Sequence, residues 1–142
     1  MNAPPIRIAA ALILDSAGRA LLVRKRGTVA FMQAGGKIEA GEAPLDALRR
    51  ELKEELAIEL AAEPEHLGRF SAPAANEEGR VVEAEIFLLR VEAEVFPAAE
   101  LEEVRWVDPV APDVVLAPLT RDHLLPLASE SIAKFKPISS RK

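Results

Sequence analysis

The stretch that decides the fold is "GKIEAGEAPLDALRRELKEELAI", residues 36–58, in which a glycine-rich segment leads into a helical pattern. Pro44 suits the first turn of a helix. From there leucines recur at spacings of three and four, which is the apolar stripe of an amphipathic helix: Leu45, Leu48, Leu52 and Leu56. The spacing predicts a helix from about Pro44 to about Leu56.

Three carboxylates crowd one side of this helix. At about 100° per residue, Glu51, Glu54 and Glu55 fall within an arc of roughly 100° beside the leucines. Like charges at these spacings repel, by a few tenths of a kcal/mol per exposed pair and by more when partly desolvated. Mg²⁺ would offset the repulsion, because it binds a few carboxylates and keeps water and phosphate oxygens as further ligands. The alternative is an ordinary solvated face, paired with neighbouring basic residues.

Composition restricts the class of protein. The 142 residues fit one domain, 1–142, with a frayed tail at about 137–142, and 49% apolar with 29% charged residues is typical of a globular chain. The net charge of -5 gives no reason to expect a nucleic acid polymer or a membrane surface as partner, because both attract a positive field.

Cysteine is absent from the sequence, which excludes disulfides and thiolate chemistry. With only His66 and His123, a bound metal is expected to be a hard cation on oxygen ligands. The apolar run "IRIAAALIL", residues 6–14, is short, contains Arg7 and leads into a turn, so we interpret it as a first strand rather than a signal peptide. A cytoplasmic protein without a membrane span is the expectation.

The first half of the chain reads as a hairpin followed by a loop. "DSAG" at 15–18 connects the strand at 6–14 to a second extended run at 19–26. Residues 27–44 are punctuated by glycines, which predicts a loop with an exposed backbone.

The second half supplies more strands and a helix. Strands are predicted at 66–72 and 80–96, and a short extended piece or turn at 102–108. A second helix is expected at 119–135, with Thr120 as its N-cap. The order predicts an α/β fold, a mixed sheet covered by helices on both faces.

The opening stretch resembles the Nudix box, whose pattern is Gly, five residues, Glu, seven residues, then Arg-Glu-apolar-any-Glu-Glu-any-Gly-apolar. Gly36, Glu42 and the "RELKEELAI" segment agree at every specified position except Ala57, which replaces the usual glycine. A left-handed conformation there costs alanine on the order of 1 kcal/mol. The resemblance implies an α/β/α sandwich with a catalytic loop-helix-loop. It also implies Mg²⁺-dependent hydrolysis, with Mn²⁺ as a substitute, of a nucleoside diphosphate linked to another moiety.

The resemblance also implies roles for the box residues. Glu51, Glu54 and Glu55 are the expected metal ligands, joined by the backbone carbonyl of Gly35. Arg50 is expected to hold and orient Glu51.

Glu42 is expected to organise the loop-helix structure or to bind a further metal. The general base is either a box glutamate or a carboxylate from a later loop. Among Glu100, Glu102 and Glu103, Glu100 is the first choice by its distance before Trp106, and a solvated turn is the alternative.

Residues outside the box give weaker indications of substrate binding. Arg24 and Arg26 share a face of a strand and are candidates for phosphate contacts, or else surface charges. Phe31 and Gln33 are candidates for stacking on and hydrogen bonding to a base, although phenylalanine is more often a core residue.

The leading hypothesis is a nucleoside triphosphate pyrophosphohydrolase, since the compact chain and "GGKIEAGE" are similar to small triphosphate-cleaving members. An ADP-ribose or ADP-sugar pyrophosphatase is the competitor, because Pro73 follows Ala57 by sixteen residues, a spacing similar to that of ADP-ribose enzymes. A non-catalytic nucleotide-sensing module is a third reading, against which the intact glutamates argue. A monomer or a homodimer is expected.

Overall fold

The computed structural model describes residues 3–131. It contains six strands, the α-helix α1 and a C-terminal helical segment that includes the π-helical turn η1. Their bounds are β1 (Ile6–Leu14), β2 (Ala20–Lys25), β3 (Ala34–Lys37), α1 (Pro44–Leu56), β4 (Glu65–Pro73), β5 (Val81–Arg90), β6 (Leu101–Val107) and η1 (Thr120–Leu124). Among these residues no helix has the length and apolar character that a membrane crossing requires. The expected frayed tail at 137–142 lies outside the described residues.

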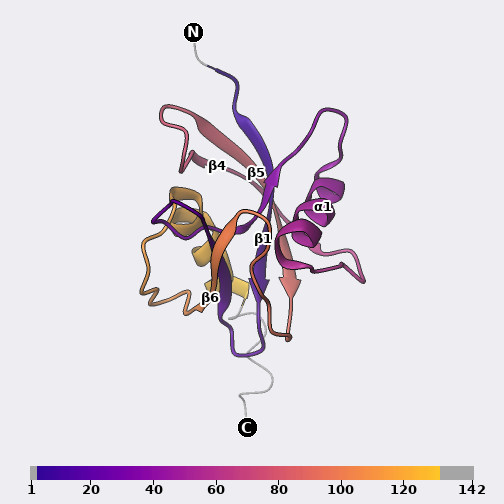
Figure 1. The fold of residues 1–142 in the computed structure, drawn as a ribbon, viewed down its shortest axis with the longest axis vertical. Helices are drawn as coiled ribbons and strands as arrows, with labels where there is room; N and C mark the ends of the chain where they lie inside the picture. Colours follow the sequence, from indigo (N-terminus) through magenta and orange to yellow (C-terminus); the bar gives the residue numbers. More distant parts are fainter. Residues whose placement is uncertain (1–2, 132–142) are drawn as a thin grey trace.

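β1 is the centre of a mixed sheet ordered β4-β5-β1-β2-β6, and both of its faces are covered. Ala9, Ala11 and Ile13 belong to the core on the α1 side, whereas the alternate residues of β1 pack against the C-terminal helical segment on the other side. Figure 1 shows the two helical layers on opposite sides of the sheet. A strand buried on both faces reads as a continuous apolar run, which explains "IRIAAALIL" and confirms the predicted sandwich.

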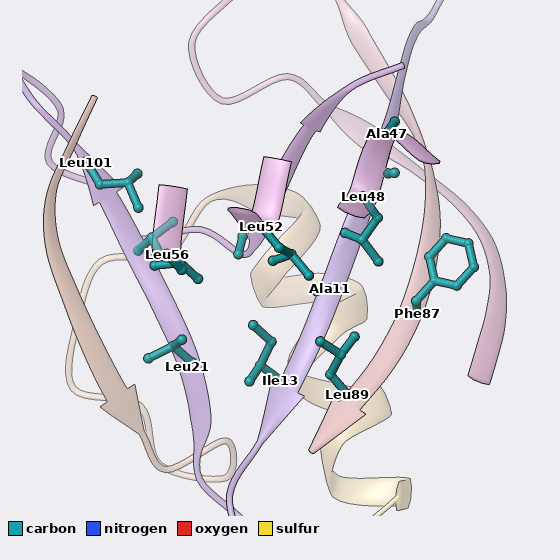
Figure 2. Packing of buried hydrophobic residues seen from close by; sticks show 13 residues of the cluster. Ala11, Ile13, Leu21, Ala47, Leu48, Leu52, Leu56, Phe87, Leu89 and Leu101 are labelled. Carbon is teal, nitrogen blue, oxygen red and sulfur yellow. The ribbon is translucent and has the colours of Figure 1, made fainter. Parts of the chain in front are cut away.

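The leucine stripe anchors α1 to the sheet. Leu48 and Leu52 have no exposed surface (0%), and Leu56 is only 4% exposed. Figure 2 shows these leucines pointing at the side chains of β1, β2 and β5. Burying each leucine stabilises the fold by about 1.5–3 kcal/mol, so the face of the helix beside this stripe is fixed relative to the strands.

β1 and β2 diverge from their hairpin, and β3 enters between them. The hairpin pairs Leu14 with Ala20, while β3 pairs antiparallel with residues 8–11 of β1. The prediction of a loop throughout 27–44 was therefore wrong at β3. Its residues "AGGK" have too few side chains to show the alternation of a strand, and pairing with β1 decides the conformation.

The remaining strands differ from prediction at their ends. β5 stops at Arg90 rather than 96, because its partner β1 ends at Leu14, paired with that residue. The piece at 102–108 is a full strand, β6, which pairs antiparallel with β2. β4 extends one residue beyond each end of the predicted 66–72, and Pro73 ends this edge strand, a position where a missing N–H is tolerated.

The second helix begins earlier than predicted. Helical turns occupy 118–131, and residues 132–135 of the predicted helix lie outside the described part of the chain. Thr120 is not the N-cap, since it lies inside the helical segment and begins the π turn. Pro118 opens the helix instead, because proline is favoured in a first turn.

Ala57 ends α1 in the left-handed conformation, with φ 56° and ψ 31°. The N–H groups of Ala57 and Ile58 donate to the carbonyls of Lys53 and Leu52 at 3.1 and 3.2 Å, and the first of these is the 5→1 bond of an αL helix cap. The side chain of Ala57 is exposed and makes no core contact that compensates for its strained backbone.

Replacing Ala57 by glycine should therefore stabilise the protein. Glycine adopts this conformation without steric cost, so Ala57→Gly should raise the free energy of unfolding by on the order of 1 kcal/mol. Ala61→Gly is the control, because Ala61 is exposed and has no positive φ. It should be neutral or destabilising by a few tenths of a kcal/mol. Equal effects of the two substitutions in urea unfolding would contradict this explanation.

Candidate active site

A pocket of about 440 Å³ opens where β1 and β2 diverge. Its walls come from β1, β2, β3, the acidic side of α1, the loop after β4 and the segments before β6 and η1. Of the residues singled out in the sequence, those lining it are Gln33, Gly35, Gly36, Glu51, Glu55, Pro73 and Glu100. The glycine strand and the acidic helix thus meet in one cavity.

Glu51 and Glu55, one helical turn apart, carry their carboxylates from α1 toward β3. The Glu55 residue is only 3% exposed, and its Oε1 lies 3.5 Å from the backbone N of Gly35, which donates to it. The Glu51 side chain is 16% exposed. Both carboxylates are therefore largely removed from bulk water at the floor of the pocket.

Gly36 makes room for Glu51. A Cβ atom on Gly36 would lie 2.4 Å from Cδ of Glu51, well inside any allowed contact. Gly35 is constrained from the other side, since its φ is 133° and a Cβ would collide with the Ala9 carbonyl of β1. The two glycines let α1 and β1 approach the same short strand from opposite directions.

The two carboxyls have raised pKa values. Burial, followed by the negative charge of Glu51, raises the pKa of Glu55 to about 7. Burial also raises the pKa of Glu51, although the hydrogen bond from Arg50 opposes the shift. These are the features of two acidic groups whose charges are not neutralised by the protein alone.

Arg50 links the helix to the loop before it. Its guanidinium donates two bonds of 2.9 Å to Glu42, one of 2.7 Å to Glu51, and one of 3.1 Å to the Lys37 carbonyl. The Arg50 hydrogen bonds lower the pKa of Glu42 to about 2. Arg50 thus fixes one oxygen of Glu51 and leaves the rest of that carboxylate facing the pocket.

Glu54 lies apart from this buried pair. Its side chain is exposed and does not line the pocket, yet its charge acts on Glu51. Within residues 3–131 no three acidic or histidine side chains already converge as a metal site. The donor set nevertheless fits a divalent cation, because Glu51 and Glu55 offer hard carboxylate oxygens, share an uncompensated negative charge and leave room for water and phosphate oxygens.

Lys25 is the site residue that the sequence reading missed. It lines the pocket, its charge acts on both Glu51 and Glu55, and its Nζ lies 3.9 Å from Oε2 of Glu100. The Glu100 backbone is held by Arg26, whose N–H donates to its carbonyl at 3.0 Å. The Glu100 side chain is 65% exposed at the pocket rim.

Three of the four residues outside the box that were predicted to bind substrate lie away from the pocket. Arg24 pairs with Glu103 at 3.2 Å, and Arg26 is exposed near Glu102 at 3.9 Å. Phe31 is 5% exposed in a small core cluster on β2 and β6, with Arg24 over its ring. Only Gln33 of this group faces the cavity.

Several solved structures share the fold of this chain. A MutT protein from Methanosarcina mazei Go1 has a TM-score of 0.74 and 22% identity, covering 93% of this chain and 98% of that one. A MutT NUDIX hydrolase from Burkholderia pseudomallei has a TM-score of 0.72 and 23% identity, covering 92% of this chain and 99% of that one. The E. coli ORF135 protein has a TM-score of 0.69 and 27% identity, covering 94% of each chain. Among curated proteins none matches the sequence.

The family model described as NUDIX domain matches residues 4–127. The chain therefore belongs to the Nudix family and is a hydrolase. Nudix hydrolases generally use divalent metal ions, in agreement with the carboxylate donors at the floor of the pocket.

Replacing Arg50 by lysine should destabilise the protein although the charge is kept. Lysine cannot bond to Glu42, Glu51 and the Lys37 carbonyl together, so Arg50→Lys should lower the free energy of unfolding by about 1–3 kcal/mol. Arg49→Lys is the matched control, because Arg49 has a single 3.4 Å bond to a carbonyl and is exposed. A loss no larger than that of Arg49→Lys in denaturant unfolding would show that the guanidinium bonds contribute little.

The buried Glu55 should make the metal-free protein less stable as pH rises. Its pKa in the folded state, about 7, lies above the ordinary 4.5, so ionisation favours the unfolded state between these values. Glu55→Gln removes this effect and should be more stable than wild type at pH 8, by on the order of 2–3 kcal/mol. The difference should close below about pH 4.5.

Urea unfolding in EDTA across this pH range makes the comparison. Glu59→Gln is the control, since Glu59 is exposed and paired only with Lys53 at 3.8 Å. Parallel stability profiles for wild type and Glu55→Gln would mean that Glu55 ionises in the folded protein as readily as in water.

Proposed function

We propose that this Nudix hydrolase is a Mg²⁺-dependent nucleoside triphosphate pyrophosphohydrolase. One observation carries the proposal: the buried carboxylates Glu51 and Glu55 and the ammonium of Lys25 face the same end of one pocket. A divalent ion bound there would neutralise phosphate oxygens and activate water. The rest of the cavity has room for a nucleoside. The compact chain and its "GGKIEAGE" segment are also similar to small triphosphate-cleaving members of the family.

Each box residue has a separate task in this proposal. Glu51, Glu54 and Glu55, with the Gly35 carbonyl, would hold the metal, with the exposed Glu54 on its solvent side. Arg50 keeps Glu51 oriented through the 2.7 Å bond, while Glu42 holds Arg50 in turn. The pairing fixes the ligand's geometry before substrate arrives.

Lys25 and Glu100 serve the reacting groups. Lys25 offers three N–H donors beside the acidic floor, so it is suited to hold a phosphate oxygen and stabilise the departing phosphate. Glu100 is proposed as the general base, since its carboxylate stands at the rim where solvent water enters. The ion pair of the two, 3.9 Å long, holds the base close to the phosphate-binding lysine.

An ADP-ribose or ADP-sugar pyrophosphatase is the second candidate. The observation in its favour is that the loop from Pro73 to Glu77 lines the pocket, so a substrate with a second sugar would contact it. Against it, the loop carries "AAN" after Pro73, where the resemblance to ADP-ribose enzymes would lead one to expect a glycine. The proposal further takes a small nucleotide rather than a nucleic acid polymer as substrate, a cytoplasmic location, and a monomer or homodimer.

A substrate panel tests the proposal. The protein is incubated with Mg²⁺ and nucleoside triphosphates, ADP-ribose, an ADP-sugar or dinucleoside polyphosphates, and phosphate and pyrophosphate release are measured. Pyrophosphate with a nucleoside monophosphate is the expected product of a triphosphate. Preferred turnover of ADP-ribose would replace the leading substrate by the second. Tight nucleotide binding without turnover of any compound would favour a nucleotide-sensing module.

Substituting the acidic groups should separate their roles. Glu54→Gln and Glu55→Gln should each lower kcat by two orders of magnitude or more, because a metal ligand is lost while the fold remains. Glu100→Gln should lower kcat by about 10²–10⁴-fold, because the general base is lost. Glu59→Gln should retain full activity. Mg²⁺-dependent turnover unchanged in Glu54→Gln and Glu55→Gln would refute the assigned metal site.

A further inference from the structure

A fully buried threonine outside the pocket is bonded to an amide that lines it. Thr120 has 0% exposure, and its hydroxyl donates to Oε1 of Gln33 at 2.7 Å. Gln33 contributes to the pocket wall and Thr120 does not. A donor placed on the amide oxygen fixes the rotation of the amide, so the NH₂ end is left for the cavity.

The backbone that carries Gln33 is held on two sides. Met32 exchanges two hydrogen bonds of 2.8 Å with Val23 of β2. Phe31 bonds through its N–H and carbonyl to the segment 115–117, at 2.8 and 2.9 Å. The short extended piece before β3 is therefore fixed between β2 and the segment that leads into the C-terminal helix, which gives the amide a defined place.

Thr120 is the first residue of a π turn in the C-terminal helical segment. It begins the π turn Thr120–Leu124, and its carbonyl accepts the N–H of Leu125, five residues on. Single π turns interrupt otherwise regular helices and occur frequently at functional sites. This one begins at the residue whose hydroxyl holds the pocket amide.

The pocket wall around Gln33 is aliphatic. Val23, Met32, Ala117 and Leu119 line it, and no aromatic side chain is among the described residues that form the cavity. A flat ring bound there contacts alkyl groups, which do not distinguish one base from another. Hydrogen bonding to the neighbouring amide then contributes the discrimination.

We propose that Thr120 is a positioning residue that presents the NH₂ of Gln33 to the substrate, so that the site selects bases with a keto oxygen over bases with an amino group at the same ring position. The inference rests on the proposed function for its substrate class, a nucleotide. It adds which bases are accepted and which pair of residues decides this.

Two matched pairs of nucleotides test the selection: inosine triphosphate against ATP, and UTP against CTP. In each pair the members differ in one exocyclic group, keto or amino, and in the adjacent ring nitrogen, which carries a hydrogen only in the keto member. Wild type should favour the keto member in kcat/KM by about tenfold or more, because an amino group opposite an NH₂ leaves both donors unpaired. Equal kcat/KM within both pairs would overturn the proposal.

Three variants isolate the two residues. Gln33→Glu replaces the NH₂ by an acceptor and should shift the preference toward the amino member of each pair. Thr120→Val keeps the shape but frees the amide to rotate, so the ratio should approach one, while Thr120→Ser should restore it. A wild-type ratio in Thr120→Val, with only stability lowered, would mean that the hydroxyl serves the fold alone and would overturn the positioning role.

Binding gives a readout that does not depend on turnover. The dissociation constants of the same four nucleotides are measured by calorimetry in the Glu54→Gln background. Keto preference in binding without hydrolysis by wild type would support this inference while contradicting the proposed function. Hydrolysis with equal binding and equal kcat/KM within each pair would support the proposed function while contradicting this inference. Failure to bind any of the four nucleotides would overturn the inference and the proposed function together.

Discussion

The contact on which the rest of the structure depends is the packing of two helical carboxylates against a glycine strand. Glu51 occupies the space that a Gly36 side chain would fill, and Glu55 accepts a hydrogen bond from the Gly35 N–H. Both glutamates are held in place, because the buried leucines of α1 fix the helix on the sheet. The free energy of the leucine contacts thus holds two acidic groups where, without a cation, they repel each other.

That arrangement opposes stability and favours function. A carboxyl whose pKa is raised to about 7 lowers the stability of the metal-free protein at neutral pH, and a divalent cation bound only to the folded state would reverse the effect. The divergence of β1 and β2 completes the site, because it opens a cavity beside the acidic floor and admits β3 between the strands. The proposed metal site and the opening for substrate therefore depend on the same feature of the sheet.

The sequence predicted whatever was encoded by periodicity or by a long motif. The bounds of α1 and of the first strand were readable from the apolar pattern, and the motif marked Ala57 as the position where a left-handed helix end would cost strain. β3 was missed because glycines carry no pattern of alternating side chains.

Lys25 was missed because the arginines beside it drew the interpretation to the wrong face of β2. Leu21 and Val23 face α1, so the next residue on that face is Lys25, a signal that strand alternation contained. The link between Thr120 and Gln33, 87 residues apart, depends on tertiary packing alone.

The central claim is that the crowded glutamates of α1 form a metal site, and locating the metal tests it most directly. Crystals of the protein soaked in Mn²⁺, which substitutes for Mg²⁺ and scatters anomalously, should show a peak bounded by the carboxylates of Glu51 and Glu55 and the backbone of Gly35. The same soak of the Glu55→Gln variant should show the peak weakened or lost. Well-ordered crystals with no peak at this position, or with manganese bound only elsewhere, would contradict the account.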